Sequence, residues 1–163
     1  MKSTMLFGAV ILTGLSAGLF YAWQVSVIPG TKRVVDLTYL ETMQSINRAI
    51  LNPAFFIIFF GSLILLSISG IYQFHSNKWV FGLMLASSIT YLIGTFGITV
   101  FGNIPLNNQL DAMRITETGA QKAAEFRQFY ETNWNRLHLI RTVFAVLSFL
   151  LAVAALFIQA RKF

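Results

Sequence analysis

Four long stretches of the chain contain no charged side chain and are dominated by apolar residues. They cover residues 3–31, 49–77, 79–110 and 142–160. A helix that crosses the hydrocarbon core of a bilayer, which is about 30 Å thick, needs roughly 20 apolar residues. The pattern therefore predicts an all-α protein, a bundle of four transmembrane helices with spans at about 5–28, 53–74, 79–102 and 138–160.

Two longer polar segments, 29–52 and 103–136, separate these spans and carry amphipathic patterns of their own. In the first, Thr38 and Glu41 fit a capping box that would start a helix, and Asn52, directly before a proline, should cap the second span. In the second, an apolar stripe continues without a helix breaker into the last span, which predicts one long helix. We expect these amphipathic helical segments to cover one face of the bundle, the outer one.

The composition agrees with a membrane protein and excludes several other classes. The 163 residues are 56% hydrophobic and 11% charged, whereas soluble domains are about a quarter charged. This length predicts a single integral membrane domain, 1–163. The chain has no cysteine, so disulfides, thiol nucleophiles and cysteine metal sites are excluded. The net charge of +6 comes from basic residues near span ends, where we expect contact with membrane lipid and not with nucleic acid.

The distribution of basic residues predicts the orientation. Lys2, Lys78, Arg161 and Lys162 fall on one side of the predicted bundle without any acid, whereas the two polar segments mix basic residues with all six acids. By the positive-inside tendency of short connections, both termini should be cytoplasmic. The first apolar run is too long for an ordinary signal peptide. We therefore expect a retained first helix and a location in a bacterial inner membrane.

Several polar and aromatic residues near the span ends should meet on the outer face. They are His138, Arg141 and Asn103 as candidate catalytic residues, and Asn47, Asn107, Asn108, Trp134, Asn135 and Arg136 as candidate substrate-binding residues. His138 and Arg141 are helical neighbours, and a cation as deep as Arg141 needs a partner or an anionic ligand. Pro105 should prevent a regular helix through Asn103. In the structural alternative, the asparagines cap helices while Trp134 and Arg136 contact headgroups.

The chain resembles the anthrone-oxygenase-like family of small four-helix membrane proteins. The resemblance rests on the segments MQSIN (43–47), NP (52–53), GNIPLNN (102–108), WNRLH (134–138) and RT (141–142). It implies a four-helix membrane bundle. For the fungal members of the family it also implies oxidation of a polycyclic anthrone to an anthraquinone by molecular oxygen, without metal or flavin.

These residues fit a cofactor-independent oxygenase that acts on a lipophilic aromatic or polycyclic small molecule. Such an enzyme must remove a proton, stabilise the resulting oxyanion and exclude bulk water. We assign His138 as the base, and Arg141 or Arg136 with Asn103 and Asn47 as oxyanion stabilisers. We expect no cofactor.

A non-catalytic function is the alternative: a membrane protein that binds a lipid or a small apolar ligand, or a structural subunit. A homo-oligomer is compatible with either function. The two histidines, His75 and His138, should lie on opposite membrane faces, which argues against a metal site. No predicted span contains Asp or Glu, so a carboxylate proton path is not expected.

Overall fold

The computed structural model describes residues 2–161, with the side chains of residues 4–161, and over this range it contains helices and no strand. Three π-helices, η1, η2 and η3, and a short 3-10 helix, η4, interrupt or join the α-helices. The elements in chain order are α1 (Lys2–Ala22), η1 (Trp23–Val27), α2 (Ile28–Thr31), α3 (Asp36–Ala49), α4 (Pro53–Gln73), α5 (Lys78–Thr90), η2 (Tyr91–Gly97), η3 (Thr99–Asn103), α6 (Ile104–Asp111), η4 (Ile115–Glu117) and α7 (Ala120–Ala160).

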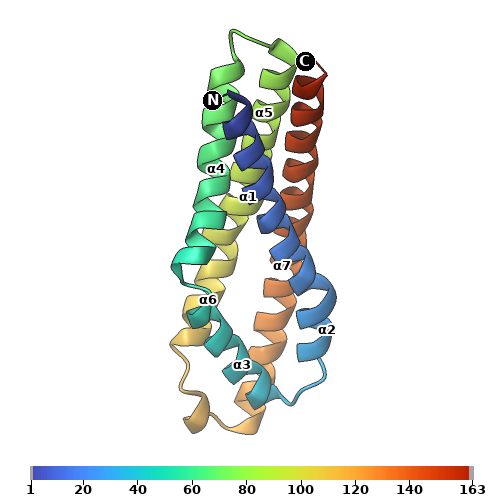
Figure 1. Ribbon diagram of the computed structural model, residues 1–163. Coiled ribbons are helices and arrows are strands. Elements are labelled where there is room, and N and C mark those ends of the chain that lie inside the picture. Colours follow the sequence, from blue (N-terminus) through green and yellow to red (C-terminus); the bar gives the residue numbers. More distant parts are fainter. Residues whose placement is uncertain (1, 162–163) are drawn as a thin grey trace.

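Four continuous helical runs are long and apolar enough to span a membrane: Thr4–Thr31, Pro53–Gln73, Lys78–Asp111 and Ala120–Ala160. This confirms the predicted all-α bundle and is the fold of an integral membrane protein. Helix α1 packs against α4 and α7, and α5 packs against the same two helices. Both termini and the α4–α5 connection lie at one end of the bundle, and α3 and α6 lie at the other (Figure 1).

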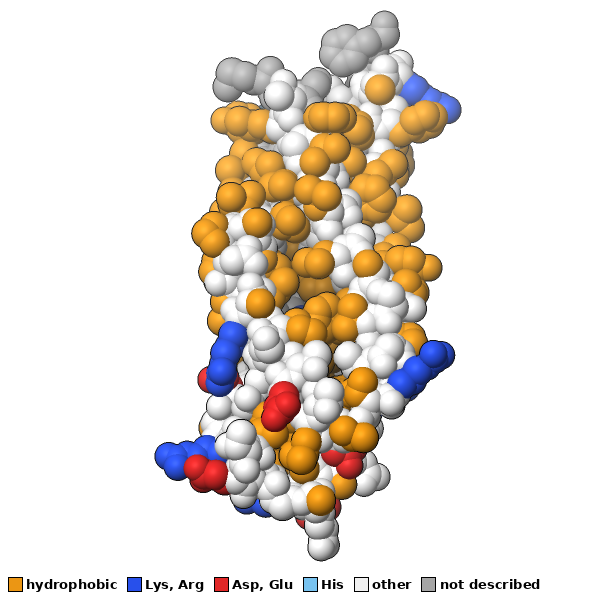
Figure 2. All heavy atoms as spheres, turned by 60° about the horizontal axis from the view of Figure 1, so that its bottom comes forward, with side chains coloured by type: hydrophobic (Ala, Val, Ile, Leu, Met, Phe, Trp, Pro, Cys, Tyr) orange, Lys and Arg blue, Asp and Glu red, His pale blue; other side chains and the backbone are white. Residues whose placement is uncertain are grey.

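Apolar side chains cover the outside of the bundle because the lipid offers them an apolar solvent. Figure 2 shows them as a broad band, with most charged side chains gathered at the end that carries α3 and α6. We call this end the cap. There, Tyr39, Leu40, Met43, Leu110 and Tyr130 belong to a buried core formed by α3, α6 and the first half of α7. The single long helix predicted for the last span is confirmed by α7.

The predicted helix starts agree with the structure in one case and not in another. The Asn52 side chain accepts a hydrogen bond from the Phe55 amide at 3.1 Å, which confirms Asn52 as the N-cap residue of α4. Thr38 does not start α3, because the helix already begins at Asp36. The Asp36 carboxylate lies in the first turn, where it is favoured by the helix dipole and is paired with Arg127 at 2.9 Å.

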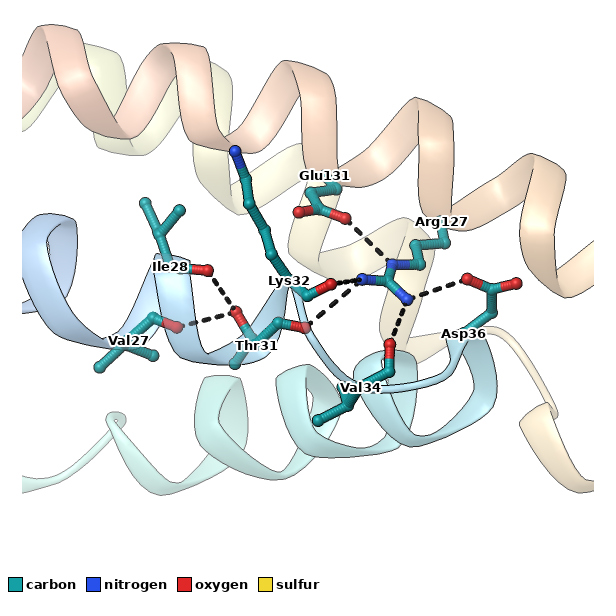
Figure 3. Close-up of polar contacts among 8 residues, drawn as sticks. All are labelled: Val27, Ile28, Thr31, Lys32, Val34, Asp36, Arg127 and Glu131. Atoms are coloured by element: carbon teal, nitrogen blue, oxygen red, sulfur yellow. Dashed lines mark hydrogen bonds and ion pairs between the residues drawn. The ribbon is translucent and has the colours of Figure 1, made fainter.

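Arg127 connects the first half of α7 to the loop between α2 and α3 (Figure 3). Its guanidinium donates hydrogen bonds to the carboxylates of Asp36 and Glu131 and to the backbone carbonyls of Thr31, Lys32 and Val34. It also lies 4.5 Å from the centre of the Tyr39 ring. Burial raises the pKa of the Tyr39 hydroxyl, which therefore stays protonated. Through these contacts Arg127 fixes where α3 lies over the end of the bundle.

The third span does not stop at its proline. The run continues through the π-helix η3, in which the Ile104 amide donates to the carbonyl of Thr99, five residues earlier. Pro105 follows in the first turn of α6, where its missing N–H is tolerated. The sequence prediction that no regular α-helix passes through Asn103 is confirmed. The π-turns widen the helix instead of ending it.

Candidate functional site

A cavity of about 280 Å³ lies where the bundle meets the cap. Its lining comes from α1, η1, α3, α4, η3, α6 and α7. These residues are Leu19, Phe20, Trp23, Ile46, Asn47, Arg48, Ile50, Leu51, Phe55, Phe56, Phe59, Phe60, Thr99, Val100, Asn103, Ile104, Asn107, Asn108, Asp111, Trp134, His138 and Arg141. Most of this surface is apolar, as in sites for lipophilic small molecules.

Four phenylalanines of α4 form one wall of the cavity, which we call the phenylalanine wall: Phe55, Phe56, Phe59 and Phe60. The rings of Phe55 and Phe59 stack with centroids 5.2 Å apart, and Phe59 stacks on Phe96 of η2 at 5.5 Å. Such parallel faces bury a large apolar area and offer flat surfaces to a planar ligand. This wall of the cavity is therefore apolar and built from aromatic rings.

The polar end of the cavity is built around His138 and Arg141, both on α7. His138 is fully buried and Arg141 is 8% exposed. Arg141 donates from Nε and Nη2 to Nδ1 of His138, at 3.1 and 2.9 Å. A guanidinium has no acceptor, so Nδ1 must be the acceptor and the imidazole proton lies on Nε2. That nitrogen then donates to the Phe20 carbonyl at 3.1 Å.

Arg141 carries a charge that no carboxylate of the described residues neutralises. Its Nη1 atom donates to the Thr99 hydroxyl at 3.3 Å. Its guanidinium carbon lies 4.7 Å from the centre of the Phe20 ring and 5.1 Å from that of the Trp134 ring. No ion pair joins it to a carboxylate in the described part of the chain. A buried cation of this kind favours an anionic or partly anionic ligand group beside it.

Asn107 fixes the aromatic residues beside this pair. Its Oδ1 atom accepts hydrogen bonds from Trp134 Nε1 at 2.8 Å and from the Tyr130 hydroxyl at 3.0 Å. Asn47 donates to the same hydroxyl at 3.1 Å. The Trp134 ring lies against the His138 ring with centroids 4.9 Å apart and planes 6° apart. Asn107 thus holds Trp134, which in turn stacks on His138, and Asn47 holds the Tyr130 hydroxyl that shares the Asn107 acceptor.

Asn103 has an unused hydrogen-bond acceptor. Its amide nitrogen donates to the Trp134 carbonyl at 3.3 Å, which sets the orientation of the amide because the oxygen would be repelled there. The Oδ1 atom is buried and has no hydrogen-bond partner within residues 4–161. Leaving such a group unpaired costs about 1–3 kcal/mol. A donor on a ligand, or a bound water, would remove this cost.

The structure brings most of the sequence-predicted site residues together around the cavity; the exceptions are Asn135 and Arg136. Trp134, His138 and Arg141 follow one another at helical spacing on the inner face of α7. Positions 135 and 136 are rotated away from this face by about 100° and 200°. Accordingly Asn135 is half-buried outside the lining and Arg136 is exposed.

Sequence reasoning missed several residues that form the site. Phe20 contributes a backbone carbonyl, which no residue type reveals. Thr99 and the phenylalanines of α4 resemble ordinary membrane residues in sequence. The π-helix η3 begins at Thr99, and η1 begins at Trp23, whose ring lies 6.3 Å from that of His138. Segments of this type are frequent at functional sites, but their hydrogen-bond pattern has no compositional signature.

The arrangement can hold an apolar molecule with one charged or polarised oxygen at Arg141. In the described residues, no three His, Asp or Glu side chains are close enough to bind a metal ion. Both nitrogens of His138 are engaged, so its lone pair becomes available to a proton only when Arg141 moves from Nδ1. Binding an oxyanion at Arg141 would provide that movement.

A comparison with protein families identifies a match. A family model described as anthrone oxygenase matches residues 54–151, more than half of the chain. The matched region contains the phenylalanine wall, Asn103, Trp134, His138 and Arg141, but not Phe20 or Asn47. In the comparisons with curated proteins and with solved structures, nothing matches. The chain belongs to the anthrone oxygenase family.

Proposed function

We propose that the protein is a membrane-embedded, cofactor-independent oxygenase that acts on a lipophilic aromatic or polycyclic small molecule. The observation that carries this proposal is Arg141, a buried guanidinium without a carboxylate partner in the described chain, at the end of an apolar cavity. An aromatic ketone with an acidic CH₂ group fits this cavity. Its enolate oxygen would lie at Arg141 and its rings along the phenylalanine wall.

The proposed reaction balances without a cofactor. The ketone loses a proton from its CH₂ group, and the carbanion adds molecular oxygen to form a C–O bond. The peroxide takes up the proton and eliminates water, which leaves a second carbonyl: R₂CH₂ + O₂ → R₂C=O + H₂O. Carbon is oxidised by four electrons, and one oxygen atom ends in the ketone and the other in water.

In this proposal Arg141 and His138 act in sequence. Arg141 turns from His138 Nδ1 to the developing enolate oxygen, where a charge-assisted hydrogen bond stabilises it. The lone pair of Nδ1 is then free to accept the CH₂ proton and later to return it to the peroxide. Asn103, with its unpaired Oδ1 atom, is the proposed third participant, as an acceptor for a ligand hydroxyl. Trp134 orients His138 by stacking on its ring, and Asn107 and Asn47 hold Trp134 and Tyr130 in place.

Oxygen uptake by the purified protein tests the proposal. Anthrone, named in the family description, is added to the protein in lipid nanodiscs, and oxygen consumption and quinone formation are followed together. We expect one quinone per oxygen consumed, at a rate above that in nanodiscs without protein. Arg141→Gln should abolish the excess rate, and Lys122→Gln, a matched change at an exposed position of the same helix, should not.

A non-catalytic ligand-binding function is the second candidate. It is favoured by one observation, the engagement of both His138 nitrogens. Anthracene carboxylate, a planar aromatic acid that is already ionised, separates the two functions. Binding of this acid without oxidation of anthrone or of related ketones would support the second candidate. Absence of both binding and turnover would remove the cavity from either role.

We also propose that the cap faces away from the cytoplasm of a bacterial cell. Support comes from charge: the end with the termini carries Lys78 and Arg161, and all six acids lie in the segments of the cap end. The chain has no cysteine, so single cysteines can be placed at will. A cysteine at Ser45 should react with an impermeant thiol reagent in intact cells, and one at Ser76 should react only after lysis.

A further inference from the structure

The cavity opens through residues that are apolar and exposed at the same time. Leu51 is 64% exposed, Phe60 43%, Ile104 41% and Phe56 39%, and all four line the cavity. A lining residue with this much exposure lies at the mouth. We call these four residues the apolar rim. In a soluble protein such an exposed apolar rim would favour aggregation. In a bilayer it contacts the lipid hydrocarbon.

The apolar rim begins at the border of the cap, with Leu51 and Ile104, and extends along α4 into the apolar band of the bundle. Helix α4 begins at Pro53, so Phe60 is about 10 Å further along the helix axis at 1.5 Å per residue. Ile104 is the first residue of α6, two residues after the predicted end of the third span at residue 102. The face in Figure 2 is hollowed within the band of apolar side chains, at the border of the zone where charges gather.

The packing of α4 explains why a mouth exists at this place. Further from the cap, α4 packs closely along α5, and the contact continues to Phe60, whose ring lies 5.9 Å from that of Phe96 in η2. Between Phe60 and the cap, α4 makes little contact with the third span, which is widened there by the π-helix η3. The two helices therefore separate where the apolar rim begins.

An exposed salt bridge lies at the aqueous end of the same mouth. Arg48 at the end of α3 and Asp111 at the end of α6 both line the cavity and are joined by a hydrogen bond of 2.6 Å. Asn108 lies beside them in the lining. A lipophilic molecule that came from water would pass these exposed charged side chains, whereas one dissolved in the bilayer meets the apolar rim.

We infer that the ligand reaches the Arg141 end of the cavity sideways from the bilayer, through the apolar rim, and not from the aqueous phase through the cap. The inference deepens the proposed function and rests on it for the identity of the ligand as a lipophilic aromatic molecule. Such a molecule partitions into hydrocarbon and enters with its ionisable oxygen first. Its apolar body then lies between α4 and η3, against the phenylalanine wall.

Cysteine reactivity tests the route without any substrate. Val100→Cys places a thiol in the cavity lining at a half-buried position of η3. Ile57→Cys is the control for the lipid phase, because Ile57 is 63% exposed on α4 and is not in the lining. Ser45→Cys, exposed on α3, is the control for water. Each protein in nanodiscs is treated with apolar pyrene maleimide or with a methanethiosulfonate that carries a quaternary ammonium group.

We expect the Val100→Cys protein to react with pyrene maleimide, as the Ile57→Cys protein does, and not with the charged reagent. Adding Ile104→Trp should abolish the first reaction at Val100 and leave that at Ile57 unchanged. Leu51→Trp provides a second block if the Ile104 variant is poorly folded, as judged by its thermal unfolding midpoint.

Three results would overturn the inference. They are faster reaction of Val100→Cys with the charged reagent, no reaction with either reagent, and a reaction with pyrene maleimide that neither tryptophan changes. Because no turnover is measured, these results are independent of the oxygen-uptake experiment. An enzyme that fails to oxidise anthrone can still show the lateral route, and an active one can lack it.

Discussion

Arg141 donates two hydrogen bonds to the Nδ1 atom of His138, at 3.1 and 2.9 Å, from a position three residues later on the same helix. The guanidinium therefore covers the only lone pair of the imidazole, since the other nitrogen donates to the Phe20 carbonyl. The pair is self-consistent without a ligand, because the histidine is neutral and the cation has acceptors. What it lacks is a negative charge, so we expect the cavity to be selective for ligands that carry an anionic oxygen.

The first prediction concerns this selectivity. Replacement Arg141→Gln should weaken the binding of anthracene carboxylate by about 10- to 100-fold, the equivalent of the 1.5–3 kcal/mol of a hydrogen bond to a charged group. Binding of hydroxymethyl anthracene, which is neutral, should change little. Ligand fluorescence in nanodiscs measures both affinities. Equal losses for the two ligands would mean that Arg141 shapes the cavity and does not recognise charge.

The same substitution predicts an unusual effect on stability. A buried cation without a carboxylate partner costs desolvation energy, and apolar or neutral replacements of buried charges are often neutral or stabilising. We therefore expect the thermal unfolding midpoint of Arg141→Gln in detergent to equal or exceed that of the original protein. A large decrease would show that the contacts of Arg141 with His138, Thr99 and the aromatic rings outweigh this cost.

A third prediction separates two roles of His138. A general base contributes about 10²- to 10⁴-fold to a rate, so His138→Gln should reduce turnover of anthrone by this order. Anthracene carboxylate is already ionised and needs no base, and its affinity should stay close to that of the original protein. If its affinity instead falls as far as in Arg141→Gln, His138 acts by positioning Arg141 and not by taking a proton.

The amino-acid sequence is sufficient to predict the bundle because hydrocarbon leaves few alternatives. Backbone groups in lipid must be paired within the chain, so four uncharged runs become four helices. The role of Asn52 as the N-cap residue of helix α4 also follows from local chemistry. The start of α3 does not, since it depends on Asp36 meeting Arg127, a residue 91 positions away.

The site was predictable only in part, and for a similar reason. His138 and Arg141 are recognisable because polar groups deep in a span are costly. The neighbouring Arg136 looks equivalent in sequence but points outward, because its side depends on which face of α7 meets the bundle. Phe20 contributes through its backbone and Asn107 through its contacts with Trp134 and Tyr130. Such roles depend on packing between helices and are invisible in one segment alone.

The fourth prediction concerns Arg127, whose side chain is 12% exposed. Replacement by alanine leaves the three carbonyls of the α2–α3 connection and two carboxylates without this donor. We expect the free energy of unfolding to fall by about 2–4 kcal/mol and the amides of residues 32–36 to exchange hydrogen faster. The matched control is Arg114→Ala, whose ion pair with Glu117 is largely exposed and should contribute less than about 1 kcal/mol.

Gly94 provides the last prediction, because its missing side chain leaves room for Phe144 of α7. A Cβ atom at this position would lie 1.9 Å from Cγ and 2.4 Å from Cβ of Phe144. These atoms are near the backbone and cannot swing away, so Gly94→Ala must push the helices apart. We expect a loss of at least about 1–3 kcal/mol from overpacking.

Phe144 lies one turn beyond Arg141 on α7, so the Gly94→Ala protein should also lose affinity for anthracene carboxylate as the guanidinium is displaced. Gly82→Ala is the control. No atom lies within 4 Å of a Cβ at Gly82, and alanine is favoured over glycine inside a helix by about 0.5–1 kcal/mol. Unfolding in detergent micelles should therefore become harder for Gly82→Ala and easier for Gly94→Ala. Equal stabilities would mean that the two helices do not approach as closely as the structure describes.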